Sequence, residues 1–310
     1  MKKSVITLIS LLALTACGGA PGSFVPDGGT EDGSGEAEAG SGVPTEISND
    51  LDAYSYQDGT LTITGLTLDS TPEAVTYHRT AALDVKGFNA YSMQEDSLDR
   101  MFIGLAGRSA DGTVTAVIAG DGGQFNRVFN GALYARSGGF DAPEIGNGPG
   151  AGQVSYAGNY AGLLNGGVNA SSPTSVLLPV PAGTDPSLVP GQAARVQGDV
   201  FMNANFTDSS VNGSIYNRTL VDSGMALPTV VLVPSDVQTD GSFGGTAEWE
   251  DQTDIGSYAG VFGGDNARWV AGGISLNDVD PNILDELERG VFILEQCNTA
   301  AAAVCDDVAQ

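Results

Sequence analysis

The stretch from Gly256 to Leu276, GSYAGVFGGDNARWVAGGISL, decides the fold. Glycine and other small residues alternate in it with three large aromatic residues, Tyr258, Phe262 and Trp269. Catalysis needs nucleophiles, bases or metal ligands, and this stretch offers one aspartate, one asparagine and one arginine around a turn. Glycines relieve crowding where strands bend tightly, and aromatic side chains pack across them. We therefore interpret the stretch as strand, turn and strand, with an architectural role.

The chain around this stretch has the pattern of a succession of short strands. Among 310 residues there are 44 glycines and 14 prolines, and only 16% are charged, which is typical of an all-β protein with many turns. Eight strand-like runs lie at residues 154–162, 195–206, 211–218, 228–234, 241–250, 255–262, 268–276 and 290–296. Eight strands close a small barrel whose interior side chains can fill. The sequence thus predicts a C-terminal eight-stranded antiparallel β-barrel over residues 153–310.

Two segments interrupt these strands. The connection from Ser171 to Gln192 carries five prolines and is expected to run outside the sheet. The segment from Asp280 to Gly290 has an N-cap candidate, a proline at the first helical position and a closing glycine. It predicts one short helix near the C-terminus.

The residues before the barrel predict a smaller β subdomain over 51–145. Asp-Gly pairs at Asp58 and Asp111 stand between alternating segments, which is the strongest short-range signal for a hairpin. A further turn is indicated at Asp121, where Asp-Gly-Gly occurs. The Gly-rich residues 146–152 indicate a hinge between the subdomain and the barrel, because the helix expected after a dinucleotide-binding loop is missing from the pattern.

The first residues form an export signal. Two lysines precede an apolar run about half as long as a membrane-spanning helix, and Leu14-Thr15-Ala16-Cys17 resembles the bacterial lipobox. We expect residues 1–16 to be removed and Cys17 to carry lipid, which anchors the chain to the bacterial outer membrane because Gly18 is not an inner-membrane retention signal. Residues 17–50, rich in glycine, serine and acids, are expected to form a disordered tether.

Charge restricts the class of partner. The formal net charge is −26, with 38 acidic residues against 12 lysines and arginines, and no basic run offsets it. Such a chain repels phosphate backbones, so nucleic acid is excluded as a main partner. We expect a monomer that meets the membrane through its lipid and binds an unknown protein or solute ligand.

The other two cysteines predict a disulfide. Cys297 and Cys305 lie eight residues apart, and in an oxidising compartment pairing is the default. Two thiolates without nearby histidines do not complete a tetrahedral zinc site. We expect neither a metal nor a cofactor.

Residues from about 153 onward resemble the β-barrel domain of the transferrin-binding protein B family of surface lipoproteins, which also includes factor H-binding lipoproteins. The resemblance is carried by Tyr-x-Gly-x-Tyr at Tyr156, the hairpin VFMNANFTDSSVNGSIYN from Val200 to Asn217, and three glycine-aromatic motifs, Gly241 to Gly245, Gly260 to Gly264 and Gly290 to Phe292. It implies an outer-membrane lipoprotein that binds something. Arg268-Trp269-Val270 and Ile293-Leu294 depart from the usual family pattern, so neither transferrin nor factor H follows as the ligand.

No catalytic constellation emerges from the chain. The single histidine, His78, lies in a strand-like segment without a nucleophile elbow, and Asp278, Asp280 and Asn282 lack the glycine and glutamate of a calcium loop. We expect a non-enzymatic binding protein whose contacts lie in the Pro-rich connection, at Val176, Leu177, Leu178, Val180, Leu188 and Val189, unless these pack back onto the barrel wall. The alternatives are a small-molecule carrier that uses a barrel cavity and an envelope hydrolase with an unrecognised carboxylate pair.

Overall fold

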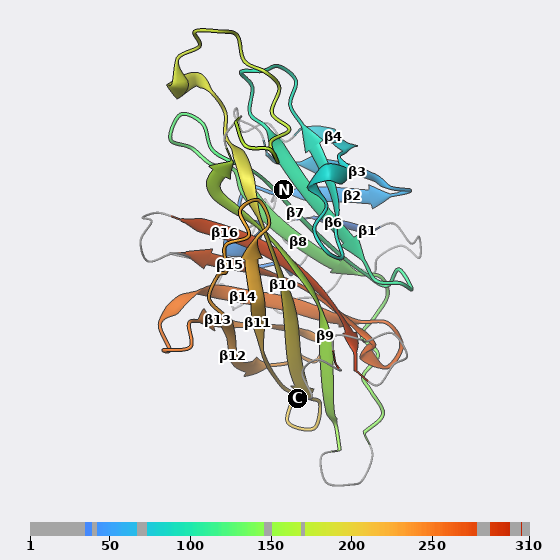
Figure 1. The fold of residues 1–310 in the computed structure, drawn as a ribbon. Coiled ribbons are helices and arrows are strands. Elements are labelled where there is room, and N and C mark those ends of the chain that lie inside the picture. Colours follow the sequence, from blue (N-terminus) through green and yellow to red (C-terminus); the bar gives the residue numbers. More distant parts are fainter. Residues whose placement is uncertain are drawn as a thin grey trace, which may run out of the picture.

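A computed structural model of the chain describes residues 35–38, 42–66, 73–145, 151–168, 171–277, 286–297 and 305. These residues form two antiparallel β units, an eight-stranded sheet and a closed eight-stranded barrel (Figure 1). None of the helices in the described ranges is long and apolar enough to cross a membrane. The all-β prediction, with a β unit followed by a barrel, is therefore confirmed.

The N-terminal sheet is a meander in which each strand pairs with the next in sequence. Its strands are β1 (Gly35–Glu38), β2 (Ala53–Gln57), β3 (Thr60–Thr64), β4 (Ala74–Arg79), β5 (Asn89–Met93), β6 (Phe102–Arg108), β7 (Val114–Asp121) and β8 (Asn130–Arg136). A short 3-10 helix, η1 (Ala81–Leu83), lies between β4 and β5. The expected hairpin turns at Asp58-Gly59 and Asp111-Gly112 fall between β2 and β3 and between β6 and β7.

Part of the expected tether is folded onto this sheet. Strand β1 pairs with β2, and α1 (Thr45–Ser48) packs Ile47 completely into the core. The backbone of α1 approaches β8 so closely that a Cβ on Gly131 would overlap the carbonyl oxygen of Ser48. Burial of Val43 and Ile47 offsets the entropy cost of ordering this segment. The sequence did not predict this, because the segment is mostly polar.

The barrel consists of the eight predicted strands. They are β9 (Gln153–Val168), β10 (Gln192–Asn205), β11 (Ser210–Leu220), β12 (Val230–Asp236), β13 (Ser242–Glu248), β14 (Asp254–Gly263), β15 (Trp269–Asn277) and β16 (Leu287–Gln296). Pairing of β16 with β9 closes the circle. The opening stretch, Gly256 to Leu276, forms most of β14, the 3-10 turn η3 (Asp265–Ala267) and most of β15, as its pattern predicts.

The helix expected from Asp280 to Gly290 needs a correction at its end. Leu287, Glu288 and Arg289 belong to β16 and pair with β15, and residues 278–285 lie outside the described ranges. The adjacent charges of Glu288 and Arg289 resemble a solvated helix end in the sequence. Both side chains are instead buried, and Glu288 forms an ion pair with Arg218 inside the barrel.

Two apolar cores hold the molecule together. One fills the barrel interior, and the other joins the sheet to the outer face of the barrel wall, where Ala161, Ala271 and Val291 pack with residues of β6, β7 and β8. Arg136 of β8 also donates a hydrogen bond of 3.0 Å to the carbonyl oxygen of Phe262. The sheet and the barrel are therefore packed units of one structure (Figure 1).

The predicted disulfide is present between Cys297, directly after β16, and Cys305. The backbone nitrogen of Cys297 donates to the carbonyl oxygen of Ser155 on β9 at 2.8 Å. The bridge therefore starts at the seam where the barrel closes. The lipidation candidate Cys17 and the calcium-like residues Asp278, Asp280 and Asn282 lie outside the described ranges.

Candidate binding surface

The Pro-rich connection between β9 and β10 is the yellow-green loop at the top of Figure 1. It contains one 3-10 turn, η2 (Pro186–Leu188), which is capped by the carboxylate of Asp185 at 2.9 Å from the nitrogen of Ser187. This loop contacts the N-terminal unit, because the nitrogen of Leu178 donates to the side-chain oxygen of Gln94 and the nitrogen of Gly191 donates to the carbonyl oxygen of Gly123.

The six apolar residues proposed for contact do not share one environment. Val176 and Leu177 are half-buried and pack against the core between sheet and barrel, which is the alternative that the sequence left open. Leu178 and Leu188 are exposed at 40% and 41%. The remaining pair, Val180 and Val189, is intermediate. The loop therefore offers two exposed leucines, held in place by two residues that are packed.

Gln124, in the turn between β7 and β8, joins this loop to two others. Its buried side-chain amide donates to the carbonyl oxygen of Leu98 at 2.9 Å and to that of Leu188 at 2.7 Å. The nitrogen of Gly191 donates to the carbonyl oxygen of Gly123 at 3.0 Å. Three segments thus meet in one surface, which we call the three-loop tip and which comprises residues 94–100, 121–128 and 171–191.

A buried ion pair supports the tip from below. Arg100 pairs with Asp121, and its guanidinium also donates to the carbonyl oxygens of Arg127 at 2.9 Å and Gln124 at 2.6 Å. Burial raises the pKa of the Asp121 carboxyl, and hydrogen bonds from Phe129 and Arg100 oppose this. Because one arginine bridges both sides of the turn, the backbone between Gln124 and Arg127 is fixed.

Phe125 stands at the apex of this fixed turn. Its φ of 53° and the φ of 55° at Asn126 place two successive residues in the left-handed region, as a tight hairpin turn requires. Its side chain is 60% exposed. A bulky residue with positive φ is an outlier that calls for a functional explanation, because glycine or asparagine would fit there without strain.

Sequence reasoning located the turn after Asp121 but not its importance. The missed residues are Leu98, Arg100, Gln124 and Phe125. An aromatic residue inside Gly-Gly-Gln-Phe-Asn was the available signal, since hairpin turns favour glycine, asparagine and aspartate. The contacts of Arg100 and Gln124 join segments distant in sequence, which no local pattern encodes.

The barrel interior is filled by large side chains. Rings of Tyr156, Phe206 and Phe243 surround Phe262, with centroids 5.1 to 5.4 Å from its own. This filling argues against the solute-carrier alternative.

A buried polar cluster occupies another part of the interior. Arg218 pairs with Glu288 at 2.6 Å, and Tyr160 donates a hydrogen bond to the same carboxylate. Burial, and then the charge of Glu288, raise the pKa of Tyr160, so its hydroxyl keeps the proton that it donates. The charge of Glu288 is thus matched by donors from two strands of the barrel.

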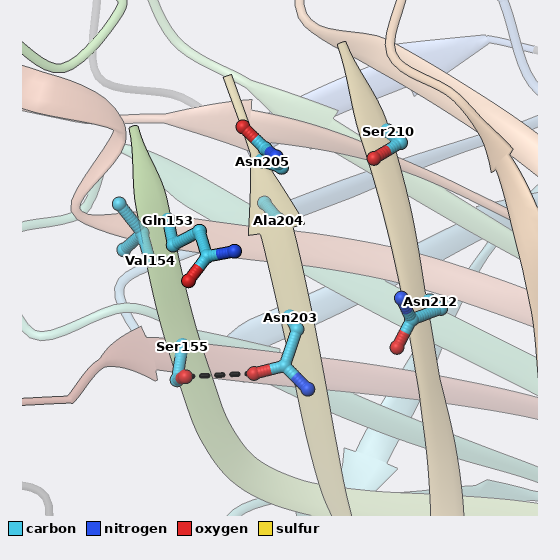
Figure 2. Close-up of a pocket in the computed structure, with 8 residues that line it drawn as sticks. All are labelled: Gln153, Val154, Ser155, Asn203, Ala204, Asn205, Ser210 and Asn212. Atoms are coloured by element: carbon cyan, nitrogen blue, oxygen red, sulfur yellow. Dashed lines mark hydrogen bonds between the residues drawn. The ribbon is translucent and has the colours of Figure 1, made fainter. Parts of the chain in front are cut away.

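Within the part of the chain that the structure describes, no group of three or more His, Cys, Asp or Glu side chains is arranged to hold a metal ion. His78 is exposed on β4. A pocket on β9, β10 and β11 is lined by eight residues without a charged side chain (Figure 2).

Comparisons with known proteins return structures but no sequence family. No protein-family model matches the chain, and no curated protein matches it either. The structure of intact Ap-TbpB, with N and C lobes, is 12% identical with a TM-score of 0.38 and covers 80% of this chain and 55% of that one. Isotype 1 transferrin-binding protein B from serogroup B Neisseria meningitidis is 13% identical with a TM-score of 0.35, covering 84% of this chain and 56% of that one.

A double mutant of transferrin-binding protein B from Haemophilus parasuis Hp5 is similar to the same degree, with 12% identity, a TM-score of 0.38 and coverage of 79% and 53%. All three belong to the group whose motifs the barrel sequence resembles. The chain spans about half the length of these proteins. Similarity of this size carries no conclusion about the ligand of this chain.

Proposed function

We propose that this chain is a non-enzymatic binding protein that holds a protein ligand at its three-loop tip. The single observation that carries the proposal is Phe125, a mostly exposed aromatic side chain on a strained turn that a buried arginine keeps rigid. Exposed aromatic anchors on preorganised loops are typical of the energetic centres of protein interfaces. A protein ligand fits this tip better than a small solute does. A protein can offer a pocket for the phenyl ring, whereas a small solute needs a concave site on this chain.

The surroundings of Phe125 complete the proposed contact. Leu98, Leu178 and Leu188 are exposed at 37%, 40% and 41%, and hydrogen bonds of the loop backbones hold the segments that carry them. The three connected loops thus carry four exposed apolar side chains, and apolar side chains are what the centres of protein interfaces bury. Neither transferrin nor factor H is part of the proposal.

The proposal places the protein at the outer membrane, anchored by lipid on Cys17. Its support is the lipobox-like Leu14-Thr15-Ala16-Cys17 together with the export signal before it. Whether the folded part faces the periplasm or the exterior is decided by protease shaving of intact cells compared with lysed cells.

Affinity capture with the exported part of the chain tests the function. Phe125→Ala is expected to lose about 10-fold to 100-fold in affinity for the captured protein, because truncation of a central aromatic anchor costs about 2 kcal/mol or more. Leu178→Ala/Leu188→Ala tests the Pro-rich loop without touching the packed Val176 and Leu177. Ile145→Ala is the matched control, since Ile145 is 46% exposed and follows the opposite end of β8.

Retained capture by both tip variants would move the binding surface away from the three-loop tip. Turnover of a substrate that co-purifies with the folded protein would overturn the non-enzymatic assignment.

A further inference from the structure

A pocket on the outer face of the barrel lies across three adjacent strands. It has a volume of about 680 Å³, within the range of roughly 300 to 1,000 Å³ of small-molecule sites (Figure 2). Its lining residues come from the start of β9, the end of β10 and the start of β11, and they are Gln153, Val154, Ser155, Asn203, Ala204, Asn205, Ser210 and Asn212.

Strand pairing arranges the polar lining residues in rows across the outer face. Ser155 pairs with Asn203, and Asn203 pairs with Asn212, so one row crosses all three strands. Gln153 and Ser210 both pair with Asn205 in the next outward-facing row. Adjacent strands lie about 4.8 Å apart, so each row presents polar groups at regular, short intervals.

Much of the hydrogen-bonding capacity of these rows is unused. Asn203 accepts a hydrogen bond of 2.7 Å from the Ser155 hydroxyl through its Oδ1, while the side chains of Gln153 and Asn212 form none with any described residue. Asn205 is held by the turn, donating to Asp208 at 2.6 Å. Figure 2 shows the side chains of Gln153, Asn203 and Asn212 together on the face of the three strands. Unused donors and acceptors therefore gather on the outward face of β9, β10 and β11.

The lining carries no charged side chain, which favours an uncharged ligand. The chain carries a net charge of −26, yet none of the eight lining residues is charged. A cation would favour carboxylates and an anion would favour arginine or lysine, whereas amides and hydroxyls match groups that donate and accept at once. Phe201, half-buried two residues before Asn203 on the same face of β10, adds an aromatic surface beside the polar rows.

We propose that this pocket binds a neutral oligosaccharide, whose hydroxyl groups are held by the amides of Gln153, Asn203 and Asn212. The proposal is independent of the three-loop tip, because the two surfaces share no residue. The pocket lies at the start of β9, whereas the Pro-rich connection of the tip follows the end of that strand.

Titration of the exported part of the chain with uncharged trisaccharides tests it. The probes are trisaccharides of glucose, galactose and N-acetylhexosamines, with sialylated trisaccharides and heparin fragments as charged counterparts. Gln153→Ala/Asn212→Ala is expected to weaken binding of a neutral trisaccharide about 10-fold to 100-fold, because two hydrogen-bonding amides are removed. Gln57→Ala/Gln238→Ala is the matched control, since both of these glutamines are exposed and lie outside the pocket.

Side-chain amide signals in NMR spectra give a second readout. A neutral trisaccharide is expected to shift the signals of Asn203 and Asn212 and to leave those of Gln57 in place. Phe125→Ala should bind the sugar as the wild type does, so failure of the protein-binding proposal and failure of this one are distinguishable. Equal affinity of the pocket variant, preference for the charged probes, or no binding of any neutral probe overturns the proposal.

Discussion

Phe125 keeps a backbone conformation that costs a residue with a Cβ about 1 to 2 kcal/mol, while most of its ring remains in water. The positive φ is unfavourable for phenylalanine, and the exposed ring gains no stabilisation from burial. The local structure is enforced by Arg100, which binds the carbonyl oxygens on both sides of the turn. Strain of this kind persists where the surroundings determine the backbone, and it is concentrated at functional sites.

Replacing the ring should separate stability from binding. Phe125→Gly is expected to raise the free energy of unfolding by up to about 1 kcal/mol, because glycine adopts a positive φ without strain, while ligand capture falls. Urea unfolding measures the stability. Asn126→Gly is the control: asparagine tolerates a positive φ better than phenylalanine does, so this substitution should raise the free energy of unfolding by less. A destabilised Phe125→Gly would show that the ring contributes to folding.

Cys17 carries the prediction for the membrane anchor. Metabolic labelling with a fatty acid should mark the wild-type chain and leave Cys17→Ala unmarked, because the lipobox-like sequence directs lipid to this thiol. Membrane partitioning of the mature chain should be lost in the same variant. Equal labelling of both proteins would refute the anchor.

Among the elements, two Asp-Gly turns share one hydrogen-bonding arrangement. Asp111 accepts from the nitrogen of Thr113 at 3.0 Å, and Asp240 accepts from the nitrogen of Ser242 at 2.9 Å. Partial burial alone would raise the pKa of each carboxyl, but the hydrogen bonds together outweigh it, so both pKa values are lowered. Ionised carboxylates therefore stabilise the hairpins.

The lowered pKa values predict a pH dependence of stability. A carboxyl whose pKa is lower in the folded state stabilises the fold above its unfolded pKa, and this contribution is lost as the pH falls through the folded value. Wild type should therefore lose more stability between about pH 5 and about pH 3 than Asp111→Asn/Asp240→Asn. Urea unfolding across this range is the measurement. Parallel losses in both proteins would contradict it.

The elements of the barrel could be predicted because each alternates inward and outward residues between recognisable turns. Prediction failed where charge was buried, as at Glu288, since its partner Arg218 lies 70 residues away in the sequence. It also failed for α1, where Ile47 is an isolated apolar residue among polar neighbours. The sequence predicted the Pro-rich loop as a contact loop, but not its connection to the other two loops of the tip, because the bonds through Gln124 join segments distant in sequence.

At the scale of the whole molecule, the sheet and the outer face of the barrel wall share one apolar core. Each of these two faces is therefore buried only while the other is folded against it. Val291→Asp places a charge in that shared core and should destabilise the protein by roughly 3 to 5 kcal/mol, with one transition for the whole chain. Unfolding can be followed by tryptophan fluorescence, which reports on Trp249 and Trp269 in the barrel unit, and by far-ultraviolet circular dichroism. The two unfolding curves should coincide.

Val231→Asp is the control for this experiment. Val231 also lies on a barrel strand, β12, but is only half-buried. Aspartate at position 231 should therefore lower the free energy of unfolding much less than aspartate at position 291. Two separate transitions in the wild type would show that the units unfold independently.

Closure of the barrel requires β9 to pair with β16. The two strands stand first and last among those of the barrel, and residues such as Tyr156 and Gln296 that pair across the seam are far apart along the chain. In a polypeptide that crosses a membrane from its N-terminus, the ring stays an open sheet until the last strand has emerged. Non-local pairing of this kind makes folding slow. For the export proposed above, the barrel would therefore cross the membrane as an open chain and close only after β16 had emerged.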